Sequence, residues 1–177
     1  MSSAETAYLF RHALLRDAAY QLQLPGDRAR LHGLAFEVIE ALAGGRPPEP
    51  PALIRLEDRR VLTHPTDPYA QALAEHARLA GSRADLGVAG KEWDVTRDLR
   101  RLYLRRAAEY LAGQFHHEEA RCMWLQYAEL VSGGEKAESL RKAALVMDLT
   151  GRLADQESLL REACSIHRDA GHRLQEG

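Results

Sequence analysis

The sequence predicts an all-α protein, and three observations support this fold class. All seven prolines lie at or before Pro68, so residues 69–177 contain none of the residue that costs about 3 kcal/mol inside a helix. Apolar residues recur at helical spacing along most of the chain. β-branched and aromatic residues are sparse, and no segment alternates polar and apolar residues as a half-buried strand does. We expect antiparallel helical hairpins stacked in a short array, preceded by an N-terminal helical hairpin.

Residues 1–43 are predicted to form the N-terminal hairpin. Its first helix begins near Ala13 and ends at Pro25-Gly26. Its second helix has apolar residues on one face, at Leu31, Leu34, Ala35, Val38, Ile39 and Leu42. Gly44-Gly45 is expected to end that helix, because glycine adopts the left-handed conformation that commonly follows a helix.

Residues 44–67 are predicted to be a linker or surface loop. Pro47, Pro48, Pro50 and Pro51 favour an extended path, since each fixes its own backbone and lacks an amide hydrogen. A proline motif that docks a partner is the alternative, but no flanking residue gives it specificity.

Residues 68–177 are predicted to hold one helix followed by two helical hairpins. Thr96 is a candidate N-cap for the second of these five helices. Their expected positions are about 72–80, 99–111, 118–131, 137–147 and 159–170. Small residues are expected where helices cross closely, at Ala107, Ala108, Ala120, Ala128, Ala143, Ala144 and Ala163.

The C-terminal helices resemble tetratricopeptide repeats. Ala120 and Ala154 are 34 residues apart, which is the period of that helix–turn–helix repeat. Residues 151–171 resemble the second half of a unit, with its turn glycine, packing residue and small residue at Gly151, Leu160 and Ala163. Residues 116–130 are similar but degenerate. The resemblance implies a tetratricopeptide-like, right-handed array over residues 68–177.

Residues 10–42 resemble a segment of the large bacterial STAND-type ATPase regulators, which include AAA-type ATPases fused to cyclase or LuxR-type modules. The match is carried by Phe10, His12, Leu15, Ala19, Tyr20, Arg30, Leu31 and His32. The resemblance implies the sensor or regulatory part of such a protein, without its ATPase domain. The family's phosphate loop is missing, because the nearest stretch, residues 87–92, has Glu92 where a magnesium-binding hydroxyl belongs.

Two groups of residues were weighed for chemistry and neither is favoured. His116, His117, Glu118 and Cys122 do not repeat the spacing of a zinc site, so we expect Cys122 in or near the core. A nucleophilic pair of Cys164 with His167 or His172 lacks a visible orienting group, so we expect a packed thiol and a surface histidine. We therefore expect no catalytic residue, no metal and no cofactor.

His12 and His32 lie in the segment that resembles the STAND-type regulators. Each imidazole is expected to hydrogen-bond a backbone carbonyl across the joint between helices, rather than to act as a titrating group.

Six residues are candidates for partner binding. Arg97, Arg101 and Arg105 are spaced four residues apart and form one stripe on a helix. Acidic residues interleave with them, so a solvated face is the simplest interpretation and an acidic partner or a nucleic acid is the alternative. Tyr103, Trp124 and Tyr127 are spaced for packing between hairpins, and periodicity alone does not separate core from groove.

Composition narrows the function class. The net charge is −2, so the chain as a whole is not drawn to nucleic acid or to an anionic membrane. No run approaches the roughly 20 apolar residues of a spanning helix, and two cysteines do not make a disulfide framework, so the cytoplasm is expected. We expect a non-enzymatic interaction module that binds a protein, a peptide or a second copy of itself. The alternative is a small metal- or nucleic-acid-binding transcriptional regulator.

Overall fold

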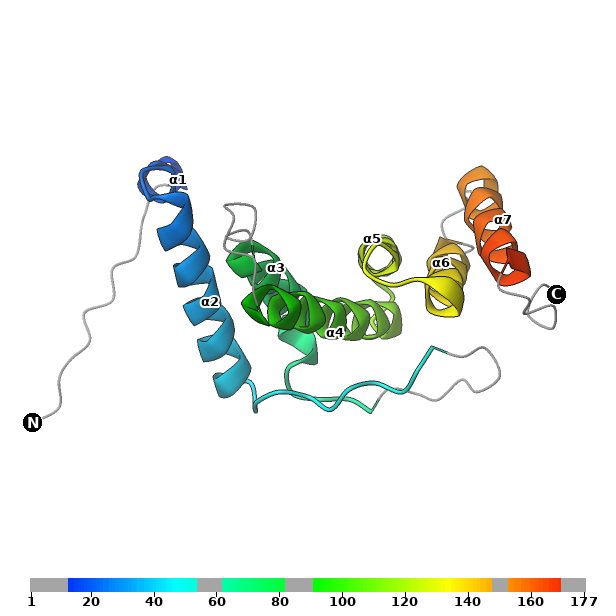
Figure 1. Ribbon diagram of the computed structural model, residues 1–177, viewed down its shortest axis with the longest axis horizontal. Helices are drawn as coiled ribbons and strands as arrows, with labels where there is room; N and C mark the ends of the chain where they lie inside the picture. Colours follow the sequence, from blue (N-terminus) through cyan, green and yellow to red (C-terminus); the bar gives the residue numbers. More distant parts are fainter. Residues whose placement is uncertain (1–12, 54–61, 82–90, 148–152, 170–177) are drawn as a thin grey trace, which may run out of the picture.

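Figure 1 presents a computed structural model of the chain, which describes residues 13–53, 62–81, 91–147 and 153–169. Within these ranges the chain forms helices and no strand, so the predicted all-α class is confirmed. The helices are α1 (Ala13–Gln21), α2 (Pro25–Leu42), the 3₁₀-helix η1 (Asp67–Tyr69), α3 (Ala70–Gly81), α4 (Lys91–Gly113), α5 (His117–Ala128), α6 (Gly133–Met147) and α7 (Leu153–Asp169).

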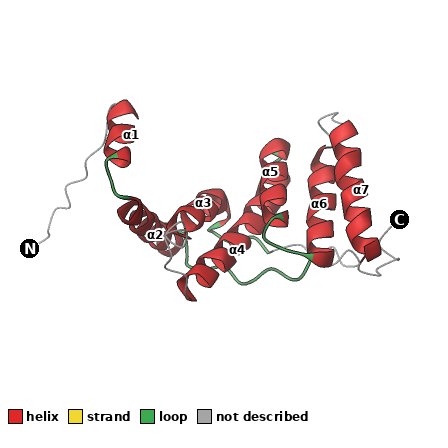
Figure 2. Ribbon diagram, turned by 45° about the horizontal axis from the view of Figure 1, so that its top comes forward, coloured by secondary structure: helices red, strands yellow, loops and turns green. Residues whose placement is uncertain are grey.

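From α2 onward, each helix packs against the next one in the chain. Figure 2 shows the resulting row, with α5, α6 and α7 side by side at the C-terminal end. Close packing depends on small side chains, and the seven alanines predicted at helix crossings are all buried. They are Ala107, Ala108, Ala120, Ala128, Ala143, Ala144 and Ala163.

The main core lies between α2, α3, α4 and α5. Phe36 of α2 meets the ring of Tyr103 of α4 edge to face, with the ring centres 5.5 Å apart. Leu73 of α3 and Trp124 of α5 belong to the same cluster. Helix α4 therefore joins α2 and α3 to α5. A second, smaller cluster, formed by Ala128, Ala137, Leu140 and Ala163, packs α5, α6 and α7 together.

The proline-rich segment packs against this core instead of standing apart as a free linker. Pro47, Pro50 and Leu53 are buried, and Leu53 belongs to the main cluster. Burial of these residues was not expected from their composition, since proline clusters are usually exposed. Figure 1 shows the described parts of the segment running beneath α3 and α4.

A buried ion pair holds the C-terminal end of this segment. Arg106 Nε of α4 donates to Asp67 Oδ1 at 2.7 Å, and the two side chains are 2% and 9% exposed. Arg106 also donates to the backbone oxygen of Leu62 at 2.9 Å, and Asp67 Oδ2 accepts the backbone N–H of His64 at 2.8 Å. Nearer the start of the segment, Glu49 pairs with Arg101 of α4 at the protein surface. Two arginines of α4 thus fix the proline-rich segment.

Two predicted helix boundaries are wrong. Thr96 lies inside α4, which begins at Lys91, because nothing between Lys91 and Ala112 interrupts a helix. The helix expected over 137–147 already begins at Gly133, and the helix before it, expected over 118–131, ends at Ala128. A glycine with a positive φ is as compatible with entering a helix as with leaving one, and Gly133 has φ 57°.

The same closing motif ends α2 and α4, but with different residues in the left-handed position. After α2, the N–H groups of Gly45 and Gly44 donate back to Glu40 and Ala41, and Gly44 has φ 100°. After α4, His116 donates to Leu111 and Phe115 donates to Ala112, with Phe115 at φ 63°. Both are Schellman motifs, and glycine is the usual occupant of this position.

We predict that Phe115→Gly stabilises the protein by about 1 kcal/mol. The left-handed conformation costs a residue with a Cβ roughly 1–2 kcal/mol, and glycine's larger unfolded-state entropy offsets part of the relief. Phe115 is 79% exposed, so its removal costs little packing. Urea denaturation measures the change. The matched control is Gly44→Ala, which we expect to destabilise, and an unchanged or lower stability for Phe115→Gly would contradict the prediction.

The outer face of α7 is polar. Its exposed residues are mostly charged or hydroxyl-bearing, and the one apolar member is small. They are Ala154, Asp155, Glu157, Ser158, Arg161, Glu162, Ser165, Arg168 and Asp169. The outer face of α7 is therefore a hydrated surface.

Candidate functional site

The predicted arginine stripe runs from the surface into the core. Arg97 is exposed and donates to the backbone oxygen of Leu130 at 3.2 Å. Arg101 is half-buried and pairs with Glu49 at 2.8 Å. Arg105 is only 5% exposed. Only the N-terminal part of the stripe faces solvent.

The three aromatic candidates lie in the core and do not line a groove. Tyr103, Trp124 and Tyr127 are each no more than 1% exposed. The hydroxyl of Tyr103 donates to Glu40 at 2.7 Å, and that of Tyr127 donates to Glu135 at 2.5 Å. Burial, together with these hydrogen bonds to carboxylates, raises the pKa of both tyrosines well above the usual value. These rings pack the helices together.

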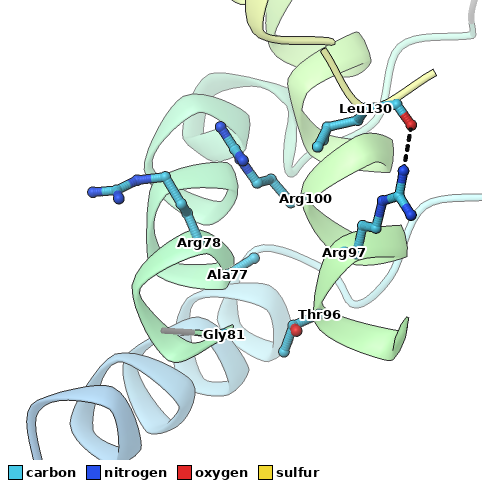
Figure 3. Close-up of a pocket in the computed structure, with 7 residues that line it drawn as sticks. All are labelled: Ala77, Arg78, Gly81, Thr96, Arg97, Arg100 and Leu130. Carbon is cyan, nitrogen blue, oxygen red and sulfur yellow. Dashed lines mark hydrogen bonds between the residues drawn. The ribbon is translucent and has the colours of Figure 1, made fainter. Parts of the chain in front are cut away.

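The structure instead brings three arginines to one pocket between α3 and α4. Arg78 comes from the last turn of α3, and Arg97 and Arg100 come from consecutive turns of α4. The cavity has a volume of about 100 Å³, and Ala77 and Leu130 supply apolar walls. In Figure 3 the side chains of Arg78 and Arg100 extend to one side, and Arg97 lies across from them, bonded to Leu130.

Positive charge in this pocket is only partly compensated. Arg78 is paired with Glu75, and its pKa is raised by that hydrogen bond. The pKa of Arg100 is lowered, first by burial and then by repulsion from Arg78, although Glu129 and Glu75 act in the opposite direction. Arg100 makes no ion pair with any residue that the structure describes. A bound anion would relieve this repulsion, so the pocket suits a small acidic group.

Arg97 and Arg100 were visible in the sequence as part of a dense basic run, but Arg78 was not. It belongs to a different helix, and no spacing rule links residues that only the packing of α3 on α4 brings together. The one local signal is that Arg78 is a basic residue in the last turn of α3, where a positive charge favours the helix dipole.

A second polar cluster joins α1, α2 and α3. Tyr20 Oη lies 2.9 Å from His32 Nε2, and His32 Nδ1 lies 2.9 Å from His76 Nδ1. His32 therefore does cross the helix joint as expected, but it bonds two side chains instead of a backbone carbonyl. His12 lies outside the described residues. One proton must be shared by the two Nδ1 atoms, so the contact requires at least one neutral ring.

We predict that the protein loses stability as the pH falls below about 6.5. The pKa of His32 is lowered from its ordinary value of 6.5, mainly by burial and next by repulsion from His76. The unfolded chain therefore takes up a proton at higher pH than the folded chain does, and acid favours unfolding. The other charged neighbours are Arg78 and Arg28, which lower the pKa further, and Glu75, which opposes them.

Urea denaturation between about pH 5 and about pH 8 checks this prediction. His32→Gln should flatten the dependence of the unfolding free energy on pH in this window. His116→Gln is the matched control, since the His116 side chain is 59% exposed and should leave the slope unchanged. Equal slopes for the parent protein and His32→Gln would contradict the assignment.

The two cysteines and their histidine neighbours do not form a site in the described ranges. No group of three or more His, Cys, Asp or Glu side chains in the described residues is arranged to hold a metal ion. Cys122 is exposed, and His167 is 3% exposed, so the expected packed Cys122 and surface His167 are both wrong. Helix α5 turns Cys122 towards solvent, and helix α7 turns His167 towards the core. His172 lies outside the described residues.

Comparisons with protein-family models, with curated proteins and with solved structures gave no match to this chain. None of the helices in the described ranges is long and apolar enough to cross a membrane. Most of the stretch that was compared with a phosphate loop, residues 87–90, lies outside the described residues.

Proposed function

We propose that this chain is a non-enzymatic helical-repeat module that binds an acidic segment of a protein partner. The observation that supports this proposal is the pocket between α3 and α4, which is lined by Arg78, Arg97 and Arg100 together with Ala77 and Leu130. Guanidinium groups bind carboxylates by paired hydrogen bonds, and apolar walls accept the methylene groups that carry a carboxylate. The stacked helices would form a tetratricopeptide-like array.

The size and setting of the pocket favour a carboxylate over a nucleic acid. A cavity of about 100 Å³ holds one small group and no stacked base. The chain's net charge of −2 gives no extended positive field for a phosphate backbone.

The chain's own proline-rich segment illustrates the proposed binding mode. It is extended at Glu49, and that carboxylate pairs with Arg101 of α4 at 2.8 Å. Arg97 lies about one turn before Arg101 on the same helix, and Arg100 directly precedes Arg101. An acidic segment of a partner would contact Arg100 in the same way.

The resemblance of residues 10–42 to STAND-type ATPase regulators suggests where such a module works. In that setting it would be the sensor or regulatory part, and partner binding would be relayed to an ATPase domain. A phosphate-loop sequence, G-x-x-x-x-G-K-[ST], in the same reading frame or in a neighbouring gene would support this role.

Peptide binding tests the proposal. We expect a fluorescein-labelled peptide Gly-Leu-Glu-Asp-Leu-Glu-Gly to bind in fluorescence anisotropy, and its Gln/Asn counterpart to bind at least about 10-fold more weakly. Arg100→Gln should weaken binding of the acidic peptide by about 10-fold, because a charged hydrogen bond is lost. Arg161→Gln is the control, because Arg161 is exposed on α7 far along the array.

Two results would overturn the proposal. One is equal binding of the acidic peptide and its amide counterpart. The other is a stronger, steeply salt-dependent affinity for a DNA duplex of about 20 base pairs, which would favour the nucleic-acid-binding alternative.

A further inference from the structure

Helix α2 is apolar on two faces, and only one of them is packed. Phe36, on the packed face, is 5% exposed and lies in the main core. On the other face Leu31, Leu34 and Val38 are 44%, 49% and 56% exposed. Leu24 and Leu42 lengthen this strip at its two ends, at 70% and 84% exposed. Figure 1 shows α2 near the N-terminal end of the row, with α3 on one side and α1 at its N-terminal end.

The exposed strip has the spacing of a coiled-coil seam. Leu31 and Val38 are seven residues apart, and Leu34 and Ala41 follow them by three residues each; in the preceding heptad Leu24 stands just before the helix and Asp27 follows it by three residues. These are the a and d positions of a heptad, which bury their side chains against another helix. The strip therefore has the shape of an interface between two helices, and not of a scattered set of surface leucines.

The charges beside the strip identify the second helix. Arg30 and Glu37 occupy the flanking g positions, both are exposed, and neither forms an ion pair within the described part of the chain. They are seven residues apart and opposite in sign. Charged residues at such flanking positions select the partner helix and its direction.

We infer that the face of α2 formed by Leu31, Leu34, Val38 and Leu42 binds a second copy of the chain, with the two α2 helices antiparallel. In that arrangement Leu31 packs on the partner's Leu34, and Leu34 on the partner's Leu31. Arg30 then lies opposite the partner's Glu37, and two-fold symmetry repeats this ion pair at the other end.

A parallel pair does not satisfy the same charges. With both helices running the same way, Arg30 would lie near the partner's Ala35, and Glu37 near the partner's Leu42. The antiparallel register also overlaps nearly the whole of α2, since residue 25 lies opposite the partner's residue 40. The contact is therefore centred on Leu31 and Leu34, with the two Arg30–Glu37 pairs beside them and Asp27 opposite the partner's Val38 towards each end.

Sedimentation velocity on the full chain, from about 1 to about 200 µM, tests the inference. We expect a monomer–dimer equilibrium with a Kd in the micromolar range. Leu34→Glu should shift the protein to monomer over this range. Leu145→Glu is the matched control, because Leu145 on α6 is 50% exposed against 49% for Leu34, and it should leave the dimer intact. A parent protein that stays monomeric at 200 µM would overturn the inference.

Charge reversal tests the direction of the helices without touching the apolar strip. Arg30→Glu and Glu37→Arg should each weaken dimerisation by about 10-fold, because both symmetric pairs become repulsive. The double variant should restore the parent affinity within about two-fold. A double variant as weak as the sum of the singles would rule out the antiparallel register. The surface is separate from the arginine pocket, so Arg100→Gln should leave the Kd of the dimer unchanged.

Discussion

Asp67→Ala is expected to lower the free energy of unfolding by about 3–5 kcal/mol. The substitution leaves the guanidinium of Arg106, 2% exposed, without its carboxylate. An unpaired buried charge cannot recover its hydration, and the backbone N–H of His64 also loses its acceptor. Because Asp67 begins η1 at the entry to α3, the loss should also loosen the proline-rich segment from α4.

The chain supplies a matched control for Asp67. Glu49 pairs with Arg101, which lies on α4 as Arg106 does. The Glu49–Arg101 distance is 2.8 Å, against 2.7 Å for Asp67–Arg106, but the side chains of Glu49 and Arg101 are 60% and 32% exposed. Glu49→Ala should therefore cost only about 0–1 kcal/mol. Urea denaturation measures both. Comparable losses for the two variants would show that burial does not control the strength of these pairs.

A double variant separates the charge effect from loss of packing. Asp67→Asn combined with Arg106→Met removes both charges and keeps most of the volume. We expect it to be less destabilising than the sum of its single variants, because each single leaves one buried charge uncompensated. Additive losses would mean that the two side chains act independently.

Trp124→Ala is expected to destabilise the protein by about 3–5 kcal/mol. Trp124 is 1% exposed and sits in the main core, where its ring meets Tyr127 edge to face at 6.0 Å. The backbone oxygen of Trp124 also accepts the hydroxyl of Ser139 of α6 at 2.8 Å. The indole therefore lies where α5 joins the main core to α6, and a cavity there should weaken both sides.

Leu145→Ala is the comparison for Trp124→Ala. Leu145 is half-exposed, so the loss of its apolar area should cost only about 1 kcal/mol. Thermal or urea unfolding gives both values. A small loss for Trp124→Ala, near that of Leu145→Ala, would mean that the helices collapse onto the vacant space.

The fold class and most helices could be predicted because they depend on local signals. The absence of proline after Pro68 and the apolar spacing predicted α-helices in every described part of residues 69–169. Gly44-Gly45 marked the end of α2 because a left-handed residue is required there. The same requirement after α4 is met by Phe115, which no preference would select, so the local signal was missing.

The sites could not be predicted to the same degree because they depend on contacts between distant residues. Asp67 and Arg106 are 39 residues apart, and no residue pattern near either one predicts a buried ion pair. Arg78 joins Arg97 and Arg100 only through the packing of α3 on α4. Tyr103, Trp124 and Tyr127 had helical spacing that suits a core or a groove equally, and only their burial decides.

The hydrated outer face of α7 limits how many copies could assemble. Open-ended fibres need two different complementary surfaces on each molecule, one at each end of the row. Here the C-terminal end presents carboxylates, guanidinium groups and hydroxyls, which keep their water. The described face of α7 therefore offers no second apolar surface, and a two-fold contact through α2 is complete when two molecules have met.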